Sequence, residues 1–107
     1  MKYRSGFVSN SSSSSFCIMG FNANKIDEDL FYEWQEKYGN HIAFENGYDC
    51  GQCIGLWAEN YLTNYSINQA KPIVLSDIET RMDKEDFDLL VSKCGDIRFI
   101  YDYGDDY

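Results

Sequence analysis

In this chain of 107 residues, the order of the apolar runs along the sequence limits the possible folds more than any other sequence feature. Short runs rich in β-branched and aromatic residues alternate with two longer stretches whose apolar residues recur at helical spacing. The predicted strands span residues 16–21, 41–45, 53–59 and 97–101, and the predicted helices span 27–39 and 76–95. This β-α-β-β-α-β order predicts one α+β domain of the ferredoxin-like kind, an antiparallel four-stranded sheet with both helices on one face.

The ends of the first predicted helix are well marked. Asp27 suits the N-cap, two acidic residues follow it in the first turn, and Gly39 ends the helix. The apolar residues of this stretch form one stripe, which consists of Leu30, Phe31, Trp34 and Tyr38. These signals predict a helix that packs this stripe on the sheet.

The second predicted helix starts at a capping-box pattern formed by Ser76 and Glu79, and Asp83 marks a second cap where it kinks or restarts. Its apolar face carries Phe87, Leu90, Val91 and Cys94, and Gly95 ends it. Residues 60–71 show no clear period and are predicted to form a long loop.

The sheet face that the helices leave uncovered is predicted to be unusually apolar. It would carry Cys17, Met19, Trp57, Arg98 and Ile100. Exposed apolar faces of this kind favour a protein partner or a homodimer, with Trp57 and Ile100 as anchors.

The chain is acidic, with 18 Asp and Glu against 9 Lys and Arg and a formal net charge of −9. Such a surface repels phosphate backbones and anionic membranes, so direct binding of nucleic acid or of a membrane is not expected. It suits a basic protein partner, or an inhibitor that occupies a basic groove in place of nucleic acid. The alternative is that the charge serves solubility alone.

No run of apolar residues is long enough for a membrane helix, and residues 6–15 are polar where a signal peptide would be hydrophobic. We therefore expect a cytoplasmic protein. In that compartment its four cysteines would be reduced thiols, metal ligands or core residues rather than structural disulfides.

Residues 50–53, Cys-Gly-Gln-Cys, form the sharpest local motif. Two thiolates at this spacing can bind zinc or close a redox disulfide. Because the predicted topology brings the end of the second helix to the same end of the sheet, Cys50, Cys53 and Cys94 are the candidate zinc ligands. Asp49 or Asp96 would supply an oxygen. Zinc is the possible cofactor, and none is otherwise expected.

The alternative for the cysteines is structural. Cys17, Cys53 and Cys94 suit a core as small apolar residues, and Cys50 then has no function. A thioredoxin-like role is disfavoured because the motif leads into a strand and not into a helix. His41, the single histidine, is predicted on a strand surface at the far end of the sheet from Cys50.

Acidic residues concentrate late in the chain, as on a solvated helix face. They also allow a sharper hypothesis, in which carboxylates on a rigid scaffold occupy a basic groove. The candidate contacts in that hypothesis are Asp83, Glu85, Asp86, Asp102, Asp105 and Asp106. No pair of carboxylates has a spacing that indicates catalysis, and no catalytic residue is predicted.

Residues 1–16 read Met-Lys-Tyr-Arg-Ser-Gly-Phe-Val-Ser-Asn, five serines and Phe. They resemble the N-terminal signature of a group of uncharacterised small bacterial and bacteriophage proteins. The resemblance implies a small α/β protein of phage or bacterial origin, and it carries over no catalytic residue.

Residues 1–15 are predicted to form a serine-rich arm ahead of a single domain that spans residues 16–107. The arm would be held to the domain by Phe7 and Val8, with serine turns satisfying its backbone. Docking to a partner, processing within residues 9–15, and a phosphate-binding nest are the alternatives. Taken together, these features predict a small non-enzymatic interaction protein of phage or prophage origin that binds a host or phage protein, and an acidic inhibitor is one form that this role could take. The alternative is a zinc-binding or thiol-dependent protein that uses Cys50, Cys53 and Cys94.

Overall fold

A computed structural model describes residues 16–47 and 50–102 of the chain. Within them the chain forms an α+β structure, which confirms the predicted class. Its elements are β1 (Phe16–Asn22), α1 (Glu28–Tyr38), β2 (Ala43–Gly47), β3 (Gly51–Trp57), α2 (Glu59–Leu62), α3 (Ile67–Arg81), α4 (Lys84–Cys94) and β4 (Arg98–Asp102).

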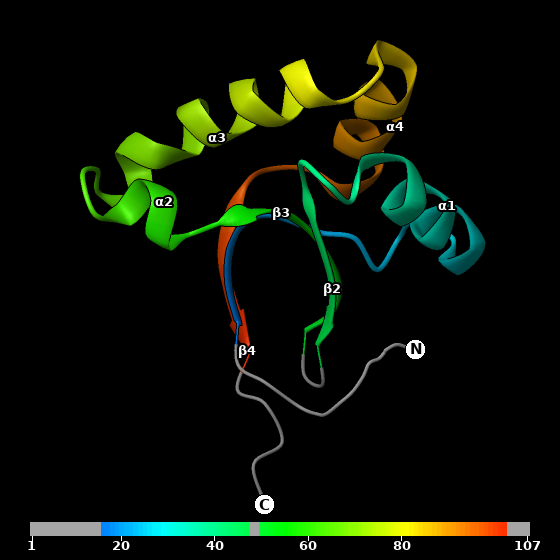
Figure 1. Ribbon diagram of the computed structural model, residues 1–107, viewed down its shortest axis with the longest axis horizontal. Coiled ribbons are helices and arrows are strands. Elements are labelled where there is room, and N and C mark those ends of the chain that lie inside the picture. The colour runs from blue at the N-terminus through cyan, green and yellow to red at the C-terminus, as the bar shows by residue number, and fades with distance from the viewer. Residues whose placement is uncertain (1–15, 48–49, 103–107) are drawn as a thin grey trace, which may run out of the picture.

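The strands form one four-stranded sheet in the order β2-β3-β1-β4, and every neighbouring pair is antiparallel. The predicted antiparallel sheet is therefore confirmed. Figure 1 shows it bent into an arch, with the helices along its outer side. The connection from β3 to β4 holds α2, α3 and α4, where the sequence predicted a single helix.

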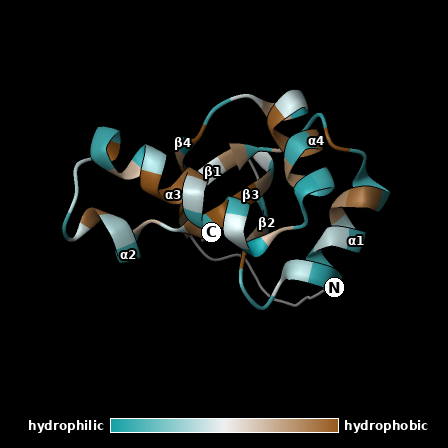
Figure 2. Ribbon diagram, turned by 90° about the horizontal axis from the view of Figure 1, so that it is seen from above, coloured by the Kyte–Doolittle hydropathy of each residue, from teal (hydrophilic) through white to brown (hydrophobic). Residues whose placement is uncertain are grey.

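All four helices contribute to the main core on the outer side of the arch. The sheet supplies Met19, Phe21, Phe44, Ile54 and Leu56, and the helices supply Phe31, Trp34, Tyr38, Tyr61, Ala70, Val74, Ile78, Phe87 and Leu90. Figure 2, which views the molecule from above, places α1 and α4 side by side at one end and α2 at the other. The stripe predicted for α1 is buried as expected at Phe31, Trp34 and Tyr38.

A second, smaller cluster lies on the inner face of the arch. Ile18, Cys53 and Ile100 are buried there, with Phe16, Ala43 and Cys50 packed against them. Ile18 lies opposite both Trp57 and Ile100, so these three side chains share that face.

The face predicted for Met19 and Cys17 was wrong. Met19 is paired with Leu56 and packs in the main core, and Cys17 shares its side of β1 because alternate residues of a strand point the same way. A continuous apolar run such as residues 16–21 contains no alternation that would show which of its residues face the helices.

The middle of the sheet depends on two glycines that face each other across β1 and β3. Gly20 is the register partner of Gly55. A Cβ at Gly55 would overlap the carbonyl oxygen of Met19 and the side chain of Ile18. The two backbones therefore lie too close for any side chain at Gly55.

The loop predicted over residues 60–71 was wrong. This segment forms α2 and the first part of α3, and α3 begins at a capping box in which Ser66 and Gln69 bond each other's backbone N–H groups. The predicted helix start at Ser76 lies inside α3. Pro72 lies inside α3, past its first turn, where it removes one backbone hydrogen bond and its ring crowds the carbonyl of the preceding turn, yet the helix continues to Arg81.

The predicted restart at Asp83 is confirmed, since α3 ends at Arg81 and Asp83 is the N-cap of α4. Asn46 and Gly47 form a dipeptide that is typical of tight turns, but both residues pair with β3 at the end of β2. The hairpin connection lies further along the chain.

Several predictions fall outside the described residues: the serine-rich arm at 1–15, Asp49, Asp105 and Asp106. Among the described helices, none is long and apolar enough to cross a membrane.

Candidate functional site

A notch opens at the edge of the sheet where β3 runs past the start of β2. Ala43, the first residue of β2, lies opposite Gly55, so Leu56 and Trp57 extend beyond the edge strand. The loop after α1, the start of α2 and the last turn of α3 surround these two residues. The notch is therefore a meeting point of elements that are far apart in the sequence.

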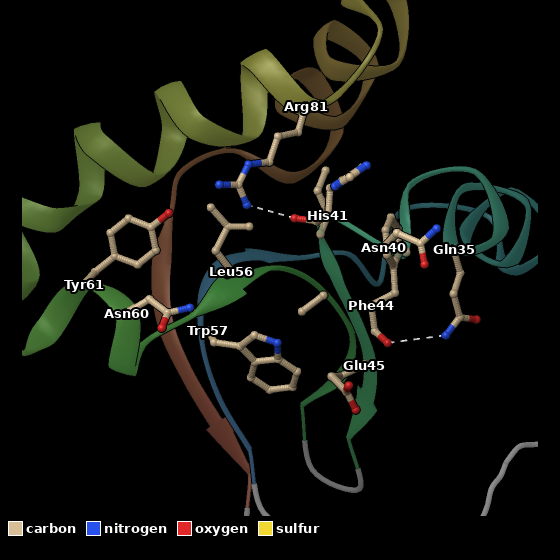
Figure 3. A pocket seen from close by; sticks show the side chains of 13 residues that line it. Gln35, Asn40, His41, Phe44, Glu45, Leu56, Trp57, Asn60, Tyr61 and Arg81 are labelled. Atoms are coloured by element: carbon tan, nitrogen blue, oxygen red, sulfur yellow. Dashed lines mark hydrogen bonds between the residues drawn. The ribbon is translucent and has the colours of Figure 1, made fainter.

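This notch holds a pocket with a volume of about 500 Å³. Its lining is mostly polar, and Figure 3 shows the side chains that surround it. The lining residues are Gln35, Gly39, Asn40, His41, Ile42, Ala43, Phe44, Glu45, Leu56, Trp57, Asn60, Tyr61 and Arg81. Below, we refer to it as the notch pocket.

Arg81 brings a positive charge to the notch pocket. Its guanidinium donates a hydrogen bond of 2.9 Å to the carbonyl oxygen of His41, which ties the end of α3 to the entrance of β2 (Figure 3). Among the described residues, no carboxylate forms an ion pair with Arg81. The group retains further N–H donors for an anionic ligand.

Tyr61 connects the wall of the pocket to α3. Its hydroxyl donates a hydrogen bond of 2.7 Å to the carboxylate of Asp77. Burial and this neighbouring negative charge raise the pKa of Tyr61 to about 12. The phenol therefore stays protonated near neutral pH and holds the start of α2 against α3.

Trp57 is the largest exposed apolar side chain of the notch pocket, with 41% of its surface accessible. The amide of Ala58 donates to the carbonyl oxygen of Cys17, so Ala58 is hydrogen-bonded to β1. Successive residues of an antiparallel ladder bond to opposite sides. The backbone N–H and C=O of Trp57 therefore point away from β1, toward the notch.

The acidic candidates on α4 are partly engaged in holding the fold. Lys37 of α1 contacts the carboxylates of Asp83 at 2.7 Å and Asp86 at 3.3 Å. The hydroxyl of Tyr38 donates to Asp86 and accepts from the amide of Asp83. The Lys37 ammonium lowers the pKa of Asp83 below its usual value. Two of the predicted groove-binding carboxylates thus join α1 to α4.

The remaining predicted contacts are placed in different environments. Glu85 is exposed in the first turn of α4, and Asp102 is the last residue of β4. Ile100 is buried in the inner cluster. Of the two predicted apolar anchors, Trp57 is therefore the one that offers surface to a partner.

The thiols of Cys50 and Cys53 lie 3.0 Å apart at the start of β3. Two thiolates on one tetrahedral zinc ion, each at about 2.3 Å from the metal, would lie about 3.8 Å apart. Within residues 16–47 and 50–102, no three His, Cys, Asp or Glu side chains gather closely enough to hold a metal ion. Cys94 thus does not join the pair, and burial raises the pKa of its thiol.

Comparisons of the chain with protein-family models, with curated proteins and with solved structures find no match. Function must be inferred from the residues themselves.

The sequence did not indicate the notch pocket. His41 was predicted on a strand surface, and Arg81 received no role. Four segments build the pocket, and no local pattern connects them. The one local signal was Trp57, which alternation had placed away from the helices.

Proposed function

We propose that this protein is a non-enzymatic interaction protein that docks a segment of a partner protein in the notch pocket. The observation that carries the proposal is the exposed indole of Trp57 beside a pocket of about 500 Å³. Tryptophan and arginine are the residues that most often dominate the energy of protein interfaces, and Trp57 and Arg81 line the same pocket. Trp57 would act as the apolar anchor.

Arg81 defines the chemistry of the partner. A guanidinium without a described ion-pair partner favours a carboxylate on the docked segment, which it would bind through two parallel hydrogen bonds. The outward backbone groups of Trp57 would bond an extended segment in place of the missing part of β2. The proposed ligand is therefore an extended segment with an acidic side chain.

The hypothesis that the protein is an inhibitor, with the carboxylates of α4 occupying a basic groove, has less support than docking in the notch pocket. Asp83 and Asp86 are already engaged by Lys37 and Tyr38, so presenting them to a basic groove would require breaking these contacts. A homodimer through the inner face is also less supported, because Ile18 and Ile100 are already buried there.

The proposal also covers the origin of the protein, its location in the cell and its type of fold. The resemblance of residues 1–16 supports a bacterial or phage protein whose partner is a host or phage protein in the bacterial cytoplasm. The strand order β2-β3-β1-β4 with antiparallel pairing supports a ferredoxin-like sheet. In that fold, the connection from β3 to β4 normally holds one helix, and here it would be enlarged by α2 and α3.

The test compares proteins captured from bacterial lysate by the wild-type chain, Trp57→Ala and Tyr65→Ala. Trp57 and Tyr65 are about equally exposed, at 41% and 43%, but Tyr65 does not line the notch pocket, so its variant is a matched control. A partner that docks in the pocket should lose about 30-fold in affinity with Trp57→Ala and keep its affinity with Tyr65→Ala.

A second variant tests the role of Arg81. Arg81→Gln removes the charge, and binding should weaken and become less sensitive to salt. Thermal unfolding monitored by circular dichroism controls for loss of the hydrogen bond to His41. If a partner binds Trp57→Ala as tightly as it binds the wild type, its interface lies outside the notch pocket and the proposal is wrong.

A further inference from the structure

We propose that Cys50 and Cys53 form a reversible intramolecular disulfide, which makes the start of β3 a site of thiol–disulfide exchange. Their sulfur atoms, 3.0 Å apart, need to approach by only about 1 Å to reach a bond length of about 2.05 Å. This site lies at the opposite end of β3 from the notch pocket and does not depend on the proposed function.

The backbone between the two cysteines is held by side-chain amides. The carbonyl oxygen of Cys50 accepts hydrogen bonds from the amides of Asn22 and Asn24, at 3.2 and 3.0 Å. The Asn24 side-chain oxygen accepts from the amide of Gln52 at 2.8 Å. The Gln52 side chain donates to the carbonyl oxygens of Ala23 and Ile26, each at 2.9 Å.

Gly51 completes this arrangement. Its φ of +75° lies in the left-handed region, and the Asn24 side chain occupies the space that a Cβ would need. The positions of both thiols are therefore set before oxidation, so closing the disulfide orders little additional backbone.

The two cysteines differ in access, which sets the order of the steps. Cys50 is half-buried, whereas Cys53 is fully buried beside Ile18 and Ile100. The Cys50 thiolate would attack a sulfur of a small disulfide such as oxidised glutathione and release one glutathione thiolate. The Cys53 thiolate would then attack the Cys50 sulfur and release the second.

The reaction is balanced by the two released thiols. The Cys50–Cys53 bond forms, the glutathione S–S bond breaks, and the two protons of the cysteines leave on two molecules of glutathione. The pair is oxidised by two electrons and the glutathione disulfide is reduced by two. Excess glutathione reverses both steps.

The experiment equilibrates the full chain in glutathione buffers of rising oxidised fraction and quenches exchange with acid. It then unfolds the chain in denaturant so that buried thiols react, blocks the remaining thiols with iodoacetamide and digests with trypsin. Trypsin leaves the Lys71–Pro72 bond intact, so residues 38–81 form one peptide that contains Cys50 and Cys53. Cys17 and Cys94 fall in other peptides and serve as internal controls. We expect the 38–81 peptide to lose two hydrogen atoms in mass and to take up no iodoacetamide.

Variants separate the roles of the two thiols. Cys53→Ser should leave glutathione attached to Cys50, and Cys50→Ser should leave Cys53 unmodified because it is buried. Cys17→Ser is the matched control and should form the disulfide as the wild type does. Asn24→Ala loosens the backbone between the cysteines, so about fivefold more oxidised buffer should be needed for half-oxidation.

Two outcomes would overturn the proposal. One is a 38–81 peptide that still takes up two iodoacetamide groups in the most oxidising buffer, while the exposed Cys17 carries glutathione. The other is a wild-type chain that stops at the mixed disulfide on Cys50.

Discussion

The two ends of β3 differ in how they are held. At the start of β3, the side chains of Asn22, Asn24 and Gln52 form hydrogen bonds that join it to the chain segment at the end of β1. At its last residues, β3 runs past β2 into the notch pocket. At the cysteine end, three hydrogen bonds of 2.8 to 3.2 Å hold the backbone of Cys50 and of Gln52, the residues on either side of Gly51. At the pocket end, the side chains of the lining form fewer such bonds: Arg81 donates to the carbonyl oxygen of His41 at 2.9 Å, and Gln35 donates to that of Phe44 at a long 3.5 Å.

The difference shows what each end can do. A fixed backbone keeps two thiols at reacting distance, which suits a reaction between groups of the same chain. An open notch keeps an indole and a guanidinium accessible, which suits docking by another molecule. One strand thus presents a preorganised end and an open end, and substitutions can separate the two.

The largest effect should come from the middle of β3, on which both ends depend. Gly55→Val places a side chain where β1 and β3 lie closest, so the sheet must separate or fail to form. We expect the free energy of unfolding to fall by at least about 3 kcal/mol, which is the upper end of the range of losses typical of overpacked sites. Urea unfolding monitored by tryptophan fluorescence measures it. Cys17→Ala, at an exposed position of β1, should unfold like the wild type.

An intermediate effect should distinguish the two ends. Asn24→Ala removes the acceptor for the Gln52 amide and a donor to Cys50, and should lower the free energy of unfolding by about 1 to 2 kcal/mol. The matched change at the pocket end, Asn60→Ala, should change it by less than about 0.5 kcal/mol. Equal losses in urea unfolding would contradict the contrast between a fastened and an open end.

The smallest effect is a pH dependence at the pocket end. The pKa of Tyr61 is about 12 in the folded protein because of burial and Asp77, above its usual value of 10.0. Its hydrogen bond therefore stabilises the fold fully below pH 10 and loses this contribution as pH rises toward 12.

Tyr61→Phe tests that sign. The variant should be less stable than the wild type at pH 9, and the difference should shrink at pH 11. Urea midpoints at the two pH values provide the comparison, and the other tyrosines cancel because both proteins contain them. A difference that stays constant with pH would assign the effect of Tyr61 to packing alone.

Local signals in the sequence were enough to predict much of the fold. Capping residues and a clear apolar stripe predicted α1, and short apolar runs predicted all four strands to within about two residues. α2 and the first part of α3 were missed because Pro72 and polar residues obscured the helical period. The signal that could have found α3 was the Ser66–Gln69 capping box.

The candidate sites were less predictable, because they depend on which segments meet. The spacing of Cys50 and Cys53 predicted their proximity, since three residues separate them in the chain. That Lys37 would engage Asp83 and Asp86 depends on the packing of α1 against α4. No residue near position 83 in the sequence indicates that Lys37 lies beside it. The sequence therefore suggested that the acidic side chains are freer to contact a partner than they are in the structure.

The position of β4 has a consequence for how the protein folds as it is synthesised. β4 comes after every other described element, yet it pairs with β1, the first of them. Until the ribosome has released residues 98–102, the outer edge of β1 lacks its partner strand and Ile18 lacks its contact with Ile100. The sheet can therefore be completed only after all the other described elements have been synthesised, and until then the growing chain exposes an edge able to pair with other nascent chains.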